Sequence, residues 1–158
     1  MESRTLFRAV SVEFEADPLP SRGAKGRFHD GAVKITYLAS RTATAWREVL
    51  ARLPDADPTA FRMVEIEAAI SAFVDLTDPA TQAKYGVTEE QLTASDHQTC
   101  RELAQRLRGA RVEAVWTYSA ADRPDGRQLV VFLDRLRSGS SVRVIAKRPV
   151  SQSNVSKP

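Results

Sequence analysis

The sequence contains few of the residues that build metal sites and disulfides. It has 1 cysteine and 2 histidines among 158 residues. Cys100 has no second cysteine to pair with, so the fold does not depend on an internal disulfide. One cysteine and two distant histidines give no zinc-binding pattern, and we expect no metal site. A P-loop and a GxGxxG motif are also missing, which argues against P-loop and Rossmann nucleotide sites.

Long apolar runs are absent as well. No stretch approaches the roughly 20 apolar residues that a membrane-spanning helix needs. The N-terminus does not show the apolar segment of a signal peptide. We therefore expect a soluble, cytoplasmic protein that does not enter a membrane.

Neither sign of charge dominates. The 23 basic and 20 acidic residues leave a net charge of +3, and aromatic residues make up 7% of the chain. A nucleic-acid-binding protein more often clusters basic residues on one face and interleaves them with aromatic residues. We therefore expect no direct nucleic-acid binding, and an activity directed at RNA is the weakest alternative. The small positive excess suits an anionic ligand or an acidic partner.

The apolar periodicity predicts one domain that mixes strands and helices. Alternating residues predict strands at 5–12, 33–39, 61–67, 72–76, 112–117, 128–133 and 141–146. Between the first two strands, residues 17–31 form a loop rich in glycine and proline, whose backbone can approach a ligand closely.

Two helices show clear apolar stripes. One is predicted to end before Pro54 and to be capped by Ser40 or Thr42, and its stripe is Trp46, Val49, Leu50 and Leu53. The other spans 95–109 and ends at Gly109. Capping boxes are predicted at Thr88–Gln91 and Ser95–Gln98.

These elements predict an α+β fold. A single compact mixed α/β domain is expected over residues 1–150, because this length buries a sufficient core without disulfides or metals. Residues 151–158 are rich in serine and are predicted to form a disordered C-terminal tail.

The motif with the most chemical content places Arg27, Tyr37 and Glu48 on three successive elements. Arg27 lies in the glycine-rich loop, Tyr37 in the next strand and Glu48 in the helix that follows, at spacings of 10 and 11 residues. An arginine, an aromatic ring and a carboxylate in this arrangement suit a site that splits a nucleotide.

Together with motifs along most of the chain, this segment resembles the RES domain, a family of bacterial toxins that consume NAD. The residues that carry the resemblance are Leu6-Phe7-Arg8, Asp17-Pro18-Leu19, Gly23, Gly26-Arg27, Tyr37-Leu38-Ala39, Thr42-Ala43-Thr44-Ala45, Glu48-Val49, Val74-Asp75-Leu76, Tyr118-Ser119-Ala120 and Leu129-Val130-Val131-Phe132-Leu133. The chain departs from the family where Arg127-Gln128 stands in place of a common Asn.

The resemblance implies a β-sheet core flanked by helices, similar to bacterial ADP-ribosyltransferase toxins. It also implies NAD as the substrate, with ADP-ribose passed to a protein acceptor. Water or phosphate as the acceptor is the alternative, in which case the enzyme depletes NAD. A partner is implied too, an Xre-like antitoxin whose C-terminal part covers the pocket. The alternative of another class is a non-catalytic module that binds a nucleotide or the antitoxin.

Cleavage of NAD at the nicotinamide–ribose bond releases a neutral ring, so no general acid is needed. The transition state carries positive charge on the ribose, which a carboxylate can stabilise. The resemblance assigns this role to Glu48. Periodicity alone instead predicts a solvated Glu48 that pairs with Arg52 at i+4.

The other site residues also follow from the resemblance. Arginine can bind phosphate oxygens with two hydrogen bonds, so Arg27 is expected to bind the diphosphate. Arg8 lies in an apolar strand, where an unpaired buried charge is costly, so its side chain is expected to face the pocket. Tyr37 offers a ring for stacking, although periodicity alone predicts core packing for it, and Phe28 is a second stacking candidate. Ser119 is expected to bond to the ligand or to Glu48.

Overall fold

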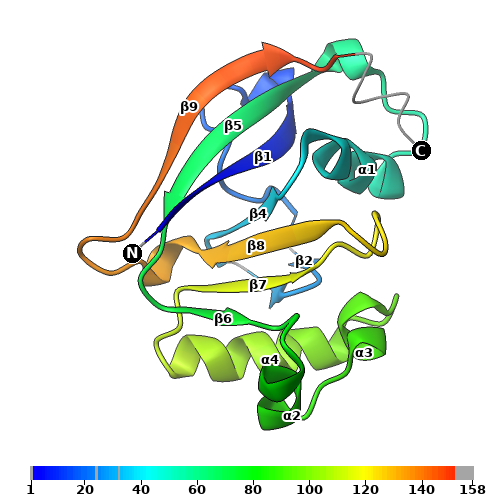
Figure 1. Cartoon of the computed structure of the whole chain (residues 1–158). Coiled ribbons are helices and arrows are strands. Elements are labelled where there is room, and N and C mark those ends of the chain that lie inside the picture. Colours follow the sequence, from blue (N-terminus) through cyan, green and yellow to red (C-terminus); the bar gives the residue numbers. More distant parts are fainter. Residues whose placement is uncertain (1, 24, 32, 152–158) are drawn as a thin grey trace.

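The fold is a seven-stranded mixed sheet with helices packed against it (Figure 1). The computed structural model describes residues 2–23, 25–31 and 33–151. The strand order is β6-β7-β8-β4-β1-β5-β9, and only β6 and β7 run parallel. The strands are β1 (Ser3–Ser11), β4 (Ile35–Ala39), β5 (Phe61–Ala69), β6 (Phe73–Asp75), β7 (Ala114–Tyr118), β8 (Arg127–Phe132) and β9 (Ser141–Pro149). A separate small hairpin consists of β2 (Lys25–Gly26) and β3 (His29–Asp30).

The helices occupy two separate places on the sheet. One α-helix follows β4, and three lie together between β6 and β7 in the chain. They are α1 (Thr42–Arg52), α2 (Pro79–Tyr85), α3 (Glu89–Thr93) and α4 (Gln98–Gly109). Short 3-10 turns are η1 (Val12–Phe14), η2 (Pro58–Ala60) and η3 (Leu133–Arg135).

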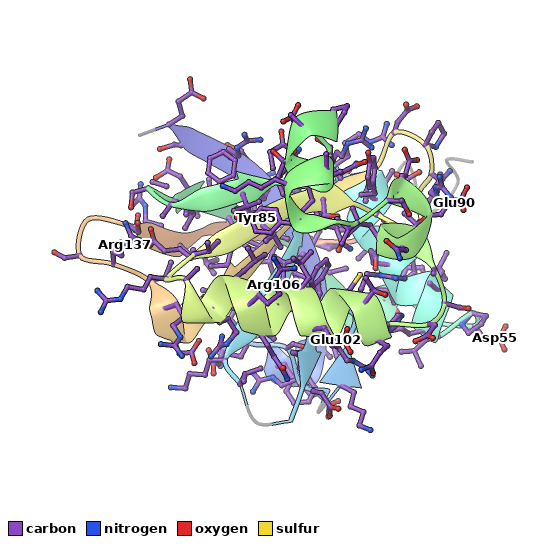
Figure 2. The ribbon with its side chains drawn as sticks, turned by 90° about the horizontal axis from the view of Figure 1, so that it is seen from below. Asp55, Tyr85, Glu90, Glu102, Arg106 and Arg137 are labelled. Atoms are coloured by element: carbon purple, nitrogen blue, oxygen red, sulfur yellow. The ribbon has the colours of Figure 1, made fainter. Side chains whose placement is uncertain are left out.

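Helix α4 packs beneath the half of the sheet that contains β6, β7 and β8 (Figure 1). Its buried stripe is Cys100, Leu103, Ala104 and Leu107, as the sequence predicts. Figure 2 looks at this helix from below, with the labelled Glu102 and Arg106 on its outer face, and both are exposed. Spacing of three and four residues therefore separates a core face from a solvated face.

Helix α1 packs against the other half of the sheet. Trp46 and Val49 are buried against Ala9 and Met63 of β1 and β5, and Trp46 meets Phe61 edge to face with ring centroids 5.4 Å apart. Because this apolar face is turned to the sheet, the opposite face of α1 is free to carry polar side chains.

The two halves of the sheet meet at a narrow seam. β1 pairs with β5 along its whole length, but within the described residues it pairs with β4 only at Phe7↔Ala39. Figure 1 shows β1, β5 and β9 tilted away from β4, β8 and β7. A single pair cannot keep the strands together, so β1 and β4 diverge and open a wedge between them.

The structure confirms the α+β fold as one compact mixed domain. It also adds elements that periodicity misses, namely α2 and the β2–β3 hairpin inside the predicted 17–31 loop. The domain boundary at 150 stays a prediction, and the predicted tail lies outside the described residues except for Ser151. None of the helices in the described part of the chain is long and apolar enough to cross a membrane.

Two of the predicted helix starts are wrong. Helix α1 has Arg41 at its N-cap with no side-chain bond, and Ser40 instead accepts a hydrogen bond from the backbone N–H of Arg127 in β8. Helix α4 starts after His97 rather than at Ser95. Tertiary contacts therefore use a hydroxyl that local sequence assigns to a cap.

Other helix ends follow the sequence more closely. The predicted capping box at Thr88–Gln91 is present, with both reciprocal hydrogen bonds. Helix α4 does end at Gly109, but the left-handed residue is Arg111, with φ at 61°. Leu53, expected on the buried stripe of α1, is 50% exposed.

Candidate active site

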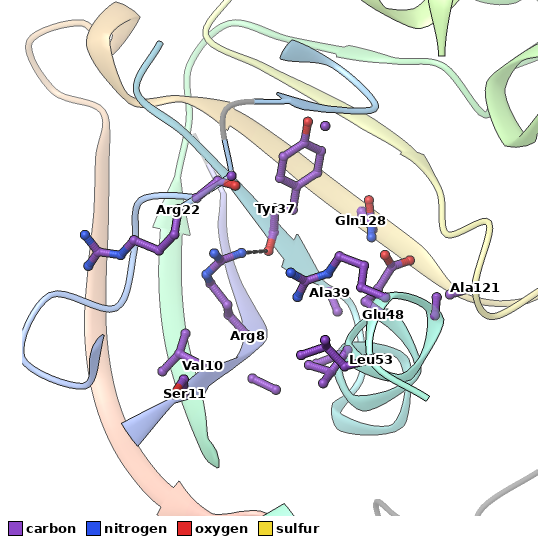
Figure 3. A pocket seen from close by; sticks show the side chains of 18 of the residues that line it. Arg8, Val10, Ser11, Arg22, Tyr37, Ala39, Glu48, Leu53, Ala121 and Gln128 are labelled. Carbon is purple, nitrogen blue, oxygen red and sulfur yellow. Dashed lines mark hydrogen bonds between the residues drawn. The ribbon is translucent and has the colours of Figure 1, made fainter. Parts of the chain in front are cut away.

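A pocket of about 750 Å³ lies where β1 and β4 diverge. This volume is within the roughly 300–1,000 Å³ that is typical of small-molecule sites. Its walls come from β1, the segment that includes the β2–β3 hairpin, β4, the polar face of α1 and the residues after β7. Arg8, Arg27, Tyr37 and Glu48 all line it, and Figure 3 shows three of them. The fold therefore brings four of the predicted site residues to one cavity.

Glu48 reaches the pocket from the polar face of α1 (Figure 3). Ser119 follows β7 and is completely buried, and its Oγ donates a hydrogen bond to Oε1 of Glu48 at 2.5 Å. Within the described residues Glu48 forms no ion pair with Arg52, the pairing that periodicity predicts. Ser119 does not itself line the pocket, so it acts by orienting the carboxylate.

Asp122 anchors the segment that carries Ser119 to α1. Its side chain is buried; Oδ2 accepts hydrogen bonds from Arg41 at 2.8 Å and from Thr44 at 2.5 Å, and Oδ1 accepts one from Arg47 at 2.5 Å. Burial acts to raise the pKa of Asp122, but these hydrogen bonds outweigh it and hold the pKa below its ordinary value. The Glu48–Ser119 pair is therefore supported by a second, ionic connection between the same two elements.

Tyr37 is held by hydrogen bonds to its hydroxyl oxygen. The backbone N–H of Phe28 donates to Oη at 2.9 Å, and Nδ1 of His29 lies 2.9 Å from the same atom. Nε2 of His29 lies 2.9 Å from the carbonyl oxygen of Gly23. Since a carbonyl can only accept, Nε2 is the donor in this contact, which leaves Nδ1 to pair with the tyrosine hydroxyl. Burial also raises the pKa of Tyr37 well above its ordinary value, so the phenol stays protonated.

The stacking role expected for Phe28 is wrong. Its side chain is 1% exposed and packs with Ile35, Leu103 and other core residues. The hairpin turns this ring inward toward α4, where it contributes to the core. Tyr37 packs against the same core and also lines the pocket, so its position is compatible with both roles that the sequence allows.

Gly26 lies directly against the side chains of His29 and Tyr37, and this close contact leads to a first prediction. A Cβ at this position would lie 2.5 Å from Cε1 of His29 and 2.7 Å from Oη of Tyr37. We expect Gly26→Ala to cost about 1–3 kcal/mol by overpacking, because the added methyl group would displace His29 and Tyr37. Thermal unfolding measures the loss of stability. Gly23→Ala is the matched control, because its Cβ would meet only the carbonyl oxygen of Lys25, at 3.4 Å; equal behaviour of the two variants would contradict the prediction.

Arg27 sits at the tip of the hairpin, which two arginines fasten to the helical layer. Nη1 of Arg27 donates to the carbonyl oxygen of Ala94 at 2.5 Å, and Nε of Arg101 donates to that of Gly26 at 2.9 Å. His97 lines the same pocket, and burial, followed by repulsion from Arg27 and Arg101, lowers its pKa. This side of the pocket is therefore positively charged while His97 stays neutral at neutral pH.

Arg8 projects from β1 into the wedge and bonds to backbone carbonyls. Nε donates to Pro18 at 3.1 Å, Nη1 to Tyr37 at 3.3 Å and Nη2 to Pro20 at 3.5 Å. Figure 3 shows the bond to Tyr37. These contacts tie the loop after β1 and strand β4 to β1, across the gap where the strands no longer pair.

The guanidinium of Arg8 pairs with no carboxylate in the part of the chain that the structure describes. Burial, with repulsion from Arg52 and then Arg22, lowers its pKa to about 10. Arg8 is still protonated at neutral pH, so the pocket contains a positive charge without a protein counterion. Such a site favours an anionic ligand.

Comparison with known proteins identifies the family. The RES domain family matches residues 5–152. The chain belongs to the RES domain family. It is 31% identical over 134 residues to a protein of Mycobacterium tuberculosis named a probable NAD(+) phosphorylase, and the match covers 82% of this chain. The chain spans 64% of that relative's length.

A solved structure supports the fold of this RES domain. The MbcT–MbcA toxin–antitoxin complex of M. tuberculosis contains a chain that superposes with a TM-score of 0.76 at 20% identity. The match covers 92% of the RES domain and 83% of the other chain. At this identity the likeness shows a shared fold.

The structure adds residues to the RES site that sequence reasoning misses. His29 holds Tyr37, and Asp122 contacts Arg47 and Arg41 across 75 and 81 residues of sequence. Local spacing gives no signal for the contacts of Asp122, because partners so far apart in the sequence meet only after the sheet forms. The contact between His29 and Tyr37 spans 8 residues and depends on the β2–β3 hairpin, which periodicity misses.

Gln128 of β8, where the sequence is expected to depart from the family pattern, belongs to the pocket wall. It is 6% exposed and lies opposite Ala39 in the β4–β8 register. Gln128 therefore places a buried amide at the pocket wall. No group of three or more His, Cys, Asp or Glu residues that could hold a metal ion occurs among the described residues.

Proposed function

We propose that this RES domain cleaves NAD at the bond between nicotinamide and ribose. The observation that carries the proposal is a carboxylate, Glu48, oriented by buried Ser119 at the wall of a pocket that Arg8 and Arg27 also line. The name of the M. tuberculosis relative, a probable NAD(+) phosphorylase, supports the same substrate.

The chemistry assigns a role to each side chain. When the glycosidic bond breaks, its electron pair passes to the ring nitrogen, and nicotinamide leaves as a neutral molecule without a proton donor. Glu48 stabilises the positive charge that develops on the ribose. Tyr37 offers its ring to the nicotinamide side of the substrate. Arg27 and Arg8 bind the phosphate oxygens through charge-assisted hydrogen bonds.

For the acceptor, we favour inorganic phosphate. The resemblance predicts transfer of ADP-ribose to a protein, but the name of the relative supports the alternative in which NAD is depleted. An oxygen of phosphate forms the new bond to the ribose carbon that nicotinamide leaves, which yields ADP-ribose 1″-phosphate. A small anion also suits a pocket that contains the unpaired charge of Arg8.

We also propose an antitoxin partner that closes this pocket. The fold is that of a chain in a toxin–antitoxin complex, and arginine side chains in the pocket suit acidic groups or a C-terminal carboxylate of a partner.

The acceptor is tested with purified protein and NAD in phosphate-free buffer, with and without added phosphate. We expect phosphate to increase nicotinamide release and to give ADP-ribose 1″-phosphate, identified by its mass. Free ADP-ribose alone would indicate hydrolysis, and label on proteins of a cell extract would indicate a protein acceptor. An unchanged amount of NAD under all conditions would contradict the enzyme and favour a non-catalytic binding module.

A further inference from the structure

The pocket extends beyond the groups that act on the ribose. One part of its wall is apolar and consists of Val10, Phe14, Leu53 and Phe61. Phe14 and Leu53 are 36% and 50% exposed. Large apolar side chains that line a cavity and stay exposed there are typical of a surface that a ligand covers.

On one wall of the pocket, helix α1 presents a carboxylate, an arginine and an apolar side chain one after another along its axis. Glu48, Arg52 and Leu53 all line the pocket from this helix and its C-terminal end. With a rise of about 1.5 Å per residue, Arg52 lies about 6 Å and Leu53 about 7.5 Å beyond Glu48 along the axis. The order along this wall is therefore carboxylate, arginine, apolar residue.

The opposite wall has its arginine and apolar groups in the same order. Arg8 and Val10 are two residues apart on β1, which places them on one face about 7 Å apart, and Phe14 follows in η1. In Figure 3, Arg8 lies between Tyr37 at one end of the pocket and Val10 at the other, and Leu53 lies at the same end as Val10. Both walls therefore change from cationic to apolar in one direction.

The middle of the pocket contains more positive charge than the described residues neutralise. Arg8 has no carboxylate partner, and repulsion from Arg52 and Arg22 acts on it in addition to burial. Arg52 forms no hydrogen bond or ion pair with the residues that the structure describes. The guanidinium of Arg22 lies over the ring of Phe14, 4.6 Å from its centroid, at the border of the apolar part.

We propose that Val10, Phe14 and Leu53 form the subsite for the adenine of NAD, and that Arg52 joins Arg8 and Arg27 in binding the diphosphate. This assignment rests on the proposed function, because it takes Glu48 as the position of the reacting ribose. The order of groups in NAD, which is ribose, diphosphate and adenosine, matches the order of Glu48, Arg52 and Leu53 on the α1 wall, and the arginine and apolar groups of β1 follow in the same direction. Glu13, which directly precedes Phe14 in η1, also lines the pocket, so this end suits a neutral base with amino and hydroxyl donors better than a second anion.

The test compares NAD with nicotinamide mononucleotide, which has the same scissile bond but no adenylate. The variants are Leu53→Ser and Phe14→Ser, and Ile145→Ser is the matched control, since Ile145 is 42% exposed and lies outside the pocket. We expect each pocket variant to lower the ratio of kcat/KM for NAD to kcat/KM for the mononucleotide about tenfold, the lower end of the effect of one apolar contact in a pocket. The control should keep the wild-type ratio.

Binding of ADP-ribose, followed by calorimetry, separates this subsite from the proposed reaction. We expect the wild type and Ile145→Ser to bind it equally, and Leu53→Ser to bind it about tenfold more weakly. If the wild type cleaves neither substrate, the proposed function fails, while the ADP-ribose titration still decides the subsite. Unchanged ADP-ribose affinity in both pocket variants, or no binding to the wild type, would overturn the subsite. A fall of the kcat/KM values for NAD and for the mononucleotide by one common factor would also overturn the subsite.

Discussion

Replacement of Glu48 by Gln is expected to lower the rate of NAD cleavage by about 30-fold to 1,000-fold, or about 2–4 kcal/mol in barrier height. The amide keeps the size of the side chain but loses the charge that stabilises the ribose cation. Because Glu48 lies on the polar face of α1 and, among the described residues, hydrogen-bonds through its side chain only to Ser119, the fold should tolerate the change. Nicotinamide release by purified protein measures the effect.

Glu90→Gln is the matched control for this variant. It removes the same charge from an exposed position on α3, outside the pocket (Figure 2). Expression in cells extends the comparison: the wild type and Glu90→Gln should arrest growth, whereas Glu48→Gln should not. Equal NAD turnover by the wild type and Glu48→Gln would remove Glu48 from the reaction, and equal toxicity of all three proteins would show that growth arrest has another source.

Asp122→Asn is expected to cause the largest loss of stability. The amide cannot accept three charge-assisted or short hydrogen bonds as the carboxylate does, and its NH₂ group faces Arg41 or Arg47. We expect a loss of about 3 kcal/mol, the lower end for a broken buried ion pair because the side chain of Arg41 is half-exposed. This corresponds to a fall in melting temperature of roughly 6–12 °C for a chain of this size.

The pH dependence of the unfolding free energy tests whether loss of the Asp122 charge causes the loss of stability. Its pKa is lowered in the folded protein, so the carboxylate contributes stability above the ordinary pKa of aspartate, about 3.9, and loses it as the pH falls through the lower folded value. The difference in unfolding free energy between the wild type and Asp122→Asn should therefore shrink below about pH 4. Other carboxylates titrate equally in both proteins. A difference that stays constant down to pH 2.5 would mean that shape, rather than charge, is lost.

Local chemistry in the sequence is enough to predict most of the regular elements. Three- and four-residue spacing predicts α1 and α4, because an apolar stripe has to be buried whatever lies opposite. The reciprocal bonds at Thr88 and Gln91 form between neighbours in the chain and are also predictable. Short elements such as α2 and the β2–β3 hairpin contain too few residues to show a period.

The candidate site likewise has features that the sequence predicts and features that only the structure shows. Arg27, Tyr37 and Glu48 are recognisable in the sequence because their residue types and order match the RES domain, whose family the chain shares. Periodicity could not separate a site role from the ordinary one for Tyr37 or Glu48. The tertiary structure shows that Tyr37 is both core and pocket wall and that Glu48 bonds to Ser119 instead of Arg52.

By itself, then, the sequence determined which stretches fold into the main strands and helices, and which residue types could serve a nucleotide. Only the tertiary structure decided that Phe28 turns into the core, that His29 holds Tyr37 and that Asp122 ties α1 to the segment after β7. The physical reason is the distance along the sequence over which each interaction acts. Periodicity and capping act between residues a few positions apart, whereas the pocket exists because β1 and β4 share one pair and then diverge, which depends on how the whole sheet is assembled.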